Sequence, residues 1–373
     1  MEKKYYELTA PQKSIWLTEQ YYKNTNINNV CGTFYSDEIL DFKIFKKALN
    51  TFLQSNDSFR IKLHFTEDKI VQYFSELKDI DFEIIDIKDK NEQSALEEKM
   101  ASKVFTMLDS LLFEIVLFRY PDNHGGFVIN SHHIISDSWT NGIVANDVAL
   151  IYSKIKKNEL YEKDKSLSYI EYINSEKQYI ESNKFQKDKE YWNNLFTTIP
   201  EVATIPSTKN AEKEDNIAAN RILLDINAGL FSKLKSFCTE NKVSLYNFFM
   251  AIFALYLGRV SNLDEFVIGT PILNRTNYKE KETTGMFINT LPLKITLSHE
   301  KTFLENLKDI AINSMSLLRH QKYSFQYLIE DLRKKEPNLP KLYNVLYSYQ
   351  ITKMNDNLDS LNHVTSWAFN KTI

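Results

Sequence analysis

The stretch at residues 131–140, Ser-His-His-Ile-Ile-Ser-Asp-Ser-Trp-Thr, constrains the fold of this chain more than any other part of the sequence. A strand-like apolar run at residues 126–130 leads into it. The apolar residues that follow it lie on one face of a predicted helix: Ile143, Val144, Val148, Ile151 and Ile155. The chain therefore turns from strand to helix within a segment rich in histidine, acid and hydroxyl groups. Such a segment between two apolar elements indicates a functional site, where we expect one histidine to meet a substrate.

The two adjacent histidines are expected to have different surroundings. Neighbouring side chains of a strand point to opposite faces, so His132 and His133 cannot both face one cavity. Asp137 follows where the chain must turn, and two roles are open to it. It can accept a hydrogen bond from a histidine ring and fix its tautomer, or it can be a buried anion that needs a cation. The best distant candidate for that cation is Arg275.

Other chemistries fit this segment less well. Two histidines and an acid could ligate zinc or iron, but adjacent strand histidines diverge and no third ligand lies nearby at helical spacing. No Gly-x-Ser-x-Gly sequence is present, which argues against a serine hydrolase. A glycine-rich phosphate loop is also absent from the sequence. We therefore predict no metal site and no nucleotide chemistry.

The remaining sequence predicts a mixture of helices and strands. Besides the helix after residue 140, helical patterns occur at residues 9–22, 42–54, 95–107, 168–196, 230–240, 244–257, 303–318 and 325–332. Strand patterns occur at residues 59–65 and 70–74, which read as a hairpin, and at 111–119, 126–130, 221–226, 266–269, 287–297 and 344–351. Residues 207–216 are polar and read as a linker. Because no regular strand–helix–strand alternation appears, the predicted fold class is α/β with mixed α+β sheets.

Length, charge and cysteine content narrow the class of protein. A chain of 373 residues is expected to form two lobes. The net charge of −3 indicates neither nucleic acid nor an anionic membrane as a partner. Two distant cysteines, Cys31 and Cys238, form no disulfide framework and suit a reducing cytoplasm. The most apolar run, residues 248–257, is about half the length that spans a bilayer, and no apolar signal core follows the N-terminus. We therefore expect a cytoplasmic location without membrane attachment.

The segment from His132 to Ser138 closely resembles the His-His-x-x-x-Asp-Gly core of condensation domains of nonribosomal peptide synthetases, which belong to the chloramphenicol-acetyltransferase-like superfamily. Further stretches resemble other blocks of that family and occur in the family's order. They lie at residues 8–16, 169–172, 191–202, 243–275, 285–293, 320–325 and 343–350. The block at 285–293, Gly-Met-Phe-Ile-Asn-Thr-Leu-Pro-Leu, matches the family's pattern almost word for word.

This resemblance implies a fold and an activity. The fold would be two acetyltransferase-like lobes in a V-shaped pseudo-dimer with a central tunnel, which we assign to residues 1–165 and 166–373. The activity would be amide-bond formation between a donor acyl or peptidyl thioester and the amine of an acceptor aminoacyl thioester. Donor and acceptor carrier proteins would present both substrates on phosphopantetheine arms, so that no cofactor binds directly. An adenylation domain of the same assembly line is a further implied partner, and the isolated domain would be monomeric.

The resemblance also implies residue roles. His133 would be the active-site histidine, either as a general base or as a hydrogen-bonding group that orients the amine. His132 would be its structural partner, and Asp137 would pair with Arg275 across the lobes. Two alternatives remain: a stand-alone acyltransferase that uses acyl-CoA, and a catalytically weak domain that docks carrier proteins. The donor stays open, since the motif favours domains that join two L-residues whereas a start at Met1 allows a fatty-acylating first domain.

Two departures from the family pattern bear on these expectations. Ser138 stands where the family usually has glycine. If that position needs a positive φ, a Cβ there causes strain; we instead expect tolerable backbone angles and an extra hydroxyl that caps the following helix. The family domain also normally continues well beyond the position of Tyr349, whereas here only residues 351–373 follow that segment. We therefore expect a second lobe that is incomplete at its C-terminal side.

Overall fold

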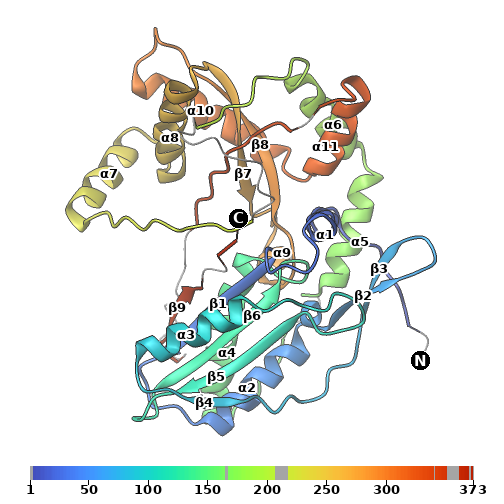
Figure 1. Ribbon diagram of the computed structural model, residues 1–373, viewed down its shortest axis with the longest axis vertical. Coiled ribbons are helices and arrows are strands. Elements are labelled where there is room, and N and C mark those ends of the chain that lie inside the picture. The colour runs from blue at the N-terminus through green and yellow to red at the C-terminus, as the bar shows by residue number, and fades with distance from the viewer. Residues whose placement is uncertain are drawn as a thin grey trace.

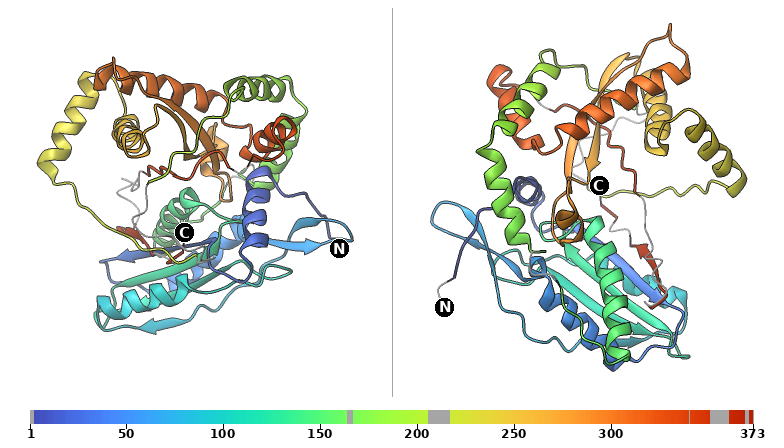
Figure 2. Two further views of the ribbon diagram at one scale, coloured as in Figure 1. Left: turned by 45° about the horizontal axis from the view of Figure 1, so that its top comes forward. Right: turned by 180° about the vertical axis from the view of Figure 1, so that it is seen from behind.

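The structure is a computed structural model that describes residues 3–163, 167–205, 217–339, 341–350, 361–368 and 371–372. Figures 1 and 2 show two bodies that meet along α1 (Ala10–Tyr21), α5 (Tyr169–Ile180) and α9 (Tyr278–Glu282). One body is built around a five-stranded sheet and the other around two long strands. Each has its own hydrophobic core, as expected for a chain of this length.

The five-stranded sheet carries the histidine segment. Its strand order is β4 (Ile84–Asp86), β5 (Phe113–Arg119), β6 (Gly125–His132), β1 (Asn29–Ser36) and β9 (Val364–Trp367). The β4–β5 pair is parallel and the other pairs are antiparallel. Every residue of β6 is buried, because helices cover both faces of the sheet (Figure 1). A strand buried on both faces reads as a continuous apolar run instead of an alternating one.

Helices pack on both faces of this sheet. α2 (Phe42–Ser55) and α4 (Ser138–Lys156) lie together on one face, and α3 (Lys90–Ala101) contacts β1 and β6 from the other. The rings of Phe34 and Phe127 stack between sheet and helices with centroids 5.0 Å apart. The helix that we predicted at residues 95–107 corresponds to α3 and lies five to six residues earlier in the chain. It begins after Asp89, whose carboxylate accepts hydrogen bonds from two backbone N–H groups of the first turn, and it ends at Ala101.

Several local predictions are confirmed. The hairpin consists of β2 (Ile61–Phe65) and β3 (Ile70–Phe74), paired antiparallel after the short helix η1 (Asp57–Arg60). α1 begins after Thr9, which forms a capping box with Gln12. The predicted segment 168–196 is helical but contains two helices, α5 and α6 (Asn183–Leu195), because Ser182 breaks it and caps the second.

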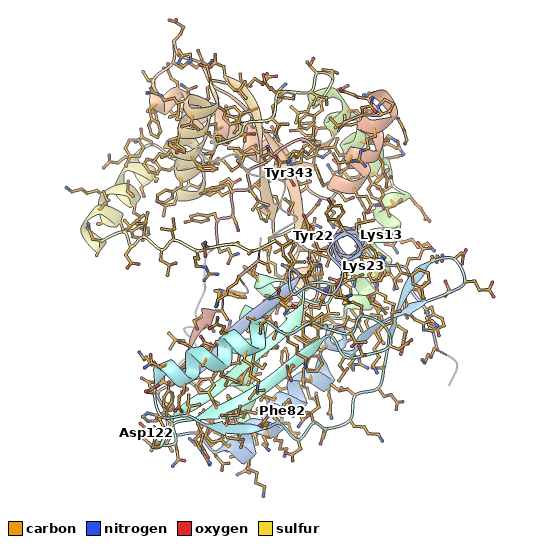
Figure 3. All side chains as sticks on the ribbon, in the orientation of Figure 1. Lys13, Tyr22, Lys23, Phe82, Asp122 and Tyr343 are labelled. Atoms are coloured by element: carbon orange, nitrogen blue, oxygen red, sulfur yellow. The ribbon has the colours of Figure 1, made fainter. Side chains whose placement is uncertain are left out.

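The second body contains the antiparallel strands β7 (Glu265–Ile272) and β8 (Asn289–Thr296). Besides α6, its helices are α7 (Ala228–Glu240), α8 (Leu245–Ser261), α10 (Phe303–Arg319) and α11 (Phe325–Lys335). Pro292 has no backbone N–H, and it lies in β8, which has β7 as its only strand partner among the described residues. Tyr343, labelled in Figure 3, covers Gly269 of β7 so closely that a Cβ at that position would overlap its ring.

Two strand predictions in this body are wrong. No strand forms at residues 221–226, where Ile222, Leu223 and Leu224 are 87%, 79% and 89% exposed. Residues 344–350 form only an isolated bridge, between Leu346 and Gly269, and residue 351 lies outside the described residues, as does the linker at 207–216. β-Propensity alone does not make a strand, because its contribution depends on a partner and on burial.

β9 was not predicted, and it joins the first sheet although it lies near the end of the sequence. The division at residues 165 and 166, the V-shaped pseudo-dimer, the tunnel and the incomplete second lobe stay predictions. Within the described ranges, no single helix is long and apolar enough to cross a bilayer, and α7 and α8 would qualify only as a pair that is bent by 102°.

Candidate active site

His133 leaves the end of β6 with its backbone and its ring both held. Its N–H donates to the carbonyl oxygen of Asn28 at 2.7 Å. Its ring Nδ1 lies 2.9 Å from the carbonyl oxygen of Ser136, and because a carbonyl oxygen only accepts, Nδ1 carries a proton. Burial lowers the pKa of His133, although the nearby Asp137 carboxylate opposes this. The neutral ring therefore has its lone pair on Nε2, where it can accept a proton.

His132 points away from His133 into the body of the protein. Its Nδ1 accepts a hydrogen bond from the backbone N–H of Ile134 at 3.1 Å. The other nitrogen, Nε2, must then carry the proton, and it lies 3.2 Å from the buried carboxylate of Glu19. The amide of Asn28 donates to the same carboxylate oxygen at 2.9 Å. Glu19 thus holds two groups that adjoin the backbone of His133, and nothing local in the sequence indicated this role.

Asp137 is the N-cap of α4 and is fully buried. One oxygen accepts hydrogen bonds from the backbone N–H and the hydroxyl of Thr140, at 2.9 and 3.0 Å. The other accepts from Arg275 Nη1 at 2.5 Å and from the backbone N–H of Phe287 at 3.1 Å. Asp137 therefore forms an ion pair with Arg275, which was one of the two roles that the sequence left open. Four hydrogen bonds in all reach its carboxylate.

Arg275 is equally enclosed. Its guanidinium donates to the carbonyl oxygens of Glu280, Thr283 and Gly285 at 3.0 to 3.2 Å. It also lies over the ring of Phe287, 3.9 Å from the centroid. Each nitrogen of this guanidinium donates to at least one acceptor, which is the arrangement that a buried charge requires. The pair therefore ties the start of α4 to the segment between β7 and β8.

Thr140 and Gly285 complete this contact, and the sequence reasoning gave neither a role. The hydroxyl of Thr140 accepts a hydrogen bond from the backbone N–H of Gly285 at 3.0 Å. Gly285 has a φ of +139°, and a Cβ there would overlap the ring of Tyr169. Only glycine suits this position. The family block at 285–293 was a usable signal for Gly285, whereas Thr140 could not be recognised without the long-range contact.

Ser138 does not have the role that we expected. Asp137 caps α4, and Ser138 is the first residue of the helix. Ser138 is not among the described residues with positive φ, so the backbone here does not require glycine. The side chain is half-buried. The departure from the family pattern is therefore compatible with the local fold.

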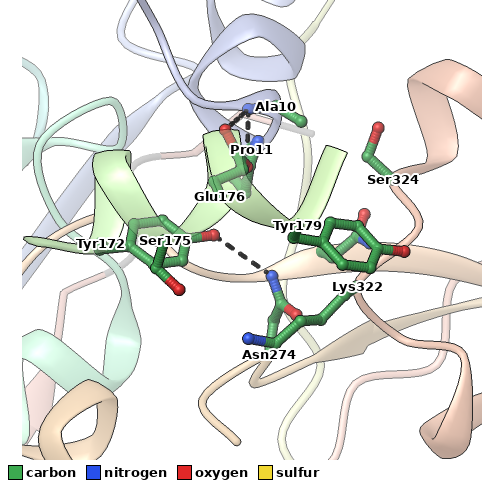
Figure 4. Close-up of a pocket in the computed structure, with 10 residues that line it drawn as sticks. Ala10, Pro11, Tyr172, Ser175, Glu176, Tyr179, Asn274, Lys322 and Ser324 are labelled. Carbon is green, nitrogen blue, oxygen red and sulfur yellow. Dashed lines mark hydrogen bonds between the residues drawn. The ribbon is translucent and has the colours of Figure 1, made fainter. Parts of the chain in front are cut away.

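A narrow pocket lies beside this site, between α1, α5 and the segment that follows β7 (Figure 4). The polar side chains that line it are Tyr172, Ser175, Glu176, Tyr179, Asn274, Asn289, Lys322 and Ser324. Both carboxylate oxygens of Glu176 accept from the backbone N–H of Ala10, at 3.1 and 3.0 Å. Burial nevertheless raises the pKa of Glu176 from 4.5 to about 7. His133 does not line this pocket.

We expect Glu176→Gln to stabilise the protein at pH 8, by on the order of 2 kcal/mol. The folded-state pKa of about 7 is above the unfolded value of 4.5, so the group stabilises the fold below pH 4.5 and this stability is lost as the pH rises through 7. Urea denaturation at pH 5 and pH 8 measures the effect, with the exposed Glu190→Gln in α6 as a control. A difference between wild type and variant that does not depend on pH would contradict the raised pKa.

In the part of the chain that is described, no three His, Cys, Asp or Glu side chains are grouped so that they could hold a metal ion. The candidate site consists of His133, with His132, Glu19 and Asn28 behind it and the Asp137–Arg275 pair at the start of α4. This arrangement can orient an amine and take up a proton at one nitrogen.

Comparisons with known proteins identify the family of this chain. A family model described as Condensation domain matches residues 2–372. Surfactin synthase subunit 1 of Bacillus subtilis (strain 168) is 35% identical over 94% of this chain, which corresponds to 10% of that protein. Bacitracin synthase 3 of Bacillus licheniformis is 27% identical over 89% of this chain and 5% of that protein. The chain thus spans a small part of the length of these relatives.

Solved structures show the same fold. A mutant of the starter condensation domain of rhizomide synthetase, in complex with C8-CoA, superimposes with a TM-score of 0.85 at 20% identity, over 99% of this chain and 84% of that one. The first condensation domain of the calcium-dependent antibiotic synthetase, in complex with a substrate analogue, gives 0.82 at 16% identity, over 99% and 86%. The predicted fold class, α/β with mixed sheets, is therefore confirmed. Given the family match over nearly all residues and the 35% identity to a surfactin synthase sequence, the chain belongs to the condensation domain family.

Proposed function

We propose that this domain forms an amide bond between a donor acyl or peptidyl thioester and the amine of an acceptor aminoacyl thioester. Donor and acceptor carrier proteins deliver the two substrates on phosphopantetheine arms. The proposal is supported by family membership and by the assembly-line synthases among the relatives. An adenylation domain supplies the acceptor residue, and the two free, buried cysteines suit a reaction in the cytoplasm.

The observation that carries the proposal is the free Nε2 lone pair of His133. Nδ1 is engaged by the carbonyl oxygen of Ser136, so only Nε2 can accept from an attacking amine. The amine nitrogen bonds to the thioester carbonyl carbon while its proton passes to Nε2, and the carbon–sulfur bond then breaks. The proton then passes from Nε2 to the sulfur atom, so that the donor arm is released as a free thiol. A neutral imidazole suits this transfer because its unprotonated nitrogen can take up the proton of the amine.

Positioning contributes beside proton transfer. A thioester is already activated towards amines, so holding the two reacting atoms together supplies part of the rate. The Asp137–Arg275 pair and Glu19 would act here as positioning residues, since they fix the backbone on both sides of His133. They do not themselves touch the reacting atoms.

The test uses loaded donor and acceptor carrier proteins, with the condensed product on the acceptor carrier detected by mass. We expect a mass increase on the acceptor carrier that depends on the domain. Wild-type protein that gives no product with any loaded pair would overturn the proposal.

A second donor is favoured by one observation. The starter condensation domain of rhizomide synthetase was solved with C8-CoA, so an acyl-CoA can replace the donor carrier in the same assay. Product from acyl-CoA in the absence of a donor carrier would assign this domain to fatty acylation of the first residue. Product from carrier-bound donors alone would assign it to elongation.

A further inference from the structure

The narrow pocket between α1, α5 and the segment that follows β7 has no part in the chemistry at His133 (Figure 4). Its cavity volume of about 10 Å³ is room for one particle of the size of a water molecule. Glu176 lines it from α5, where the two bodies meet, and Asn274 lines it from the second body, just after β7. An occupant of this cavity would therefore lie at the junction of the two bodies.

The carboxylate of Glu176 lacks a counter-charge in this pocket. The side chain is half-buried, with its carboxyl group at the enclosed end. Both oxygens accept from the backbone N–H of Ala10, and no ion pair of Glu176 forms within the described part of the chain. Lys13 and Lys322 are near enough to lower its pKa, but burial outweighs them. Lys322 instead pairs with Glu280, with Nζ 3.1 Å from Oε1. An enclosed carboxylate without a paired cation is costly.

Asn274 supplies a second group that lacks a partner. It is 5% exposed, and its Nδ2 donates to the carbonyl oxygen of Phe287 at 3.1 Å and to the hydroxyl of Tyr172 at 3.5 Å. These contacts fix the orientation of the amide. They leave Oδ1 buried with no hydrogen-bond partner among the described residues. A native fold contains few such atoms, and each one calls for an explanation. The same small pocket thus has a carboxylate and an amide oxygen that both need a positively polarised partner.

The groups that line the pocket indicate the class of ligand. Both unmatched groups are oxygen acceptors, and the hydroxyl groups of Ser175 and Ser324 add further oxygen atoms. Hard cations prefer oxygen ligands. One carboxylate balances a single positive charge, and the described residues contain no group of three His, Cys, Asp or Glu side chains that could hold a metal ion of higher charge. A water molecule would satisfy the hydrogen bonds but would leave the charge of Glu176 unbalanced.

We propose that this pocket binds a monovalent cation of about the size of a water molecule, such as K⁺ or NH₄⁺, between the Glu176 carboxylate and Asn274 Oδ1. The ion balances the charge of Glu176 and satisfies the unpartnered amide oxygen. It also joins α5 to the segment that leads from β7 to Arg275, so that it stabilises the contact between the two bodies. This inference does not depend on the proposed function, because His133 does not line the pocket.

The test measures the melting temperature of the purified domain at pH 8 in KCl, NH₄Cl and choline chloride of equal ionic strength. Choline is too large for the cavity. We expect K⁺ or NH₄⁺ to raise the Tm of wild type by about 2 °C or more relative to choline, and the two arms show which ion the site prefers. Glu176→Gln keeps the size of the side chain but removes its charge, so this variant should lose the response. Glu190→Gln, which alters an exposed glutamate of α6, is the matched control and should respond like wild type.

The pH supplies a further check. The cation binds the ionised carboxyl group, whose pKa is raised to about 7, so the response to K⁺ should be present at pH 8 and lost as the pH falls to 5. In choline chloride at pH 8, Glu176→Gln should melt above wild type, and K⁺ should narrow this difference. A response of equal size at both pH values would contradict a site built on Glu176.

A crystal of the domain soaked in thallium(I) acetate locates the ion directly, because Tl⁺ replaces K⁺ and scatters anomalously. We expect an anomalous peak between Glu176 and Asn274 in wild type and none there in Glu176→Gln. A wild-type pocket without this peak would overturn the inference, because its occupant would then be a water molecule. Equal melting temperatures in all three salts, or a response that persists in Glu176→Gln, would overturn it as well. Neither measurement involves amide formation, so failure here leaves the proposed function untouched.

Discussion

Replacing Arg275 with alanine is expected to lower the free energy of unfolding by about 3–5 kcal/mol. The Asp137 carboxylate would lose its counter-charge while it stays fully buried, and the guanidinium side chain is itself fully enclosed. An unpaired buried carboxylate is far more costly than a missing surface ion pair. Urea denaturation of the purified domain measures the change.

The chain offers a matched control for this prediction. Arg119 and Asp86 form an ion pair of similar length, 2.7 Å, but their side chains are 38% and 70% exposed. We expect Arg119→Ala to cost less than about 1 kcal/mol. The stability loss of Arg275→Lys should lie between those of Arg275→Ala and Arg119→Ala. A lysine keeps the charge but cannot reach the several carbonyl oxygens that the guanidinium contacts. Equal stability of Arg275→Ala and wild type would show that the pair does not hold the fold.

His133→Ala is expected to reduce the rate of amide formation by a factor of about 100 to 10,000 while leaving KM for the carriers nearly unchanged. We expect the lower end of this range, because the thioester is activated and the remaining site still aligns the substrates. Single-turnover reactions with loaded carriers measure the chemical step directly. A rate equal to that of wild type would remove His133 from the mechanism.

The pH dependence separates a base from a structural group. Burial lowers the pKa of His133 from its ordinary value of 6.5, so wild-type kcat/KM should fall only below that pH. This acidic limb should be missing from His133→Ala. His124→Ala is the control, since His124 lies in a turn of the same body beside Asp122, and it should behave like wild type.

The parts of the fold that could be predicted were those fixed by nearby residues. Thr9 and Gln12 mark the start of α1, and the acidic turn at 66–68 marks the hairpin. The segment at 221–226 has the composition of a strand but has no ladder in the described chain. β9 was missed for the opposite reason, since its four residues gain their structure from a partner far away in sequence.

The same distinction holds for the candidate site. The family pattern indicated His133, Asp137 and Arg275, and the structure brings the last two together at 2.5 Å. Glu19 and Thr140 carry no local signal, because an acid within a helix and a threonine in a first turn are ordinary residues. Their contacts join segments more than a hundred residues apart. Such partners are fixed by the tertiary fold, and one sequence does not contain them in readable form.

The pairing of β9 with β1 has a consequence for the order in which this protein can be made. Gly32 pairs with Trp367, so 335 residues must be added after the first partner before the second exists. At a ribosomal rate of about 5–20 residues per second, this takes roughly 17 to 67 seconds. During that time the outer edge of β1 remains open to strands of other nascent chains. The first sheet is thus completed only after most of the second body has been synthesised, which couples the maturation of the two bodies.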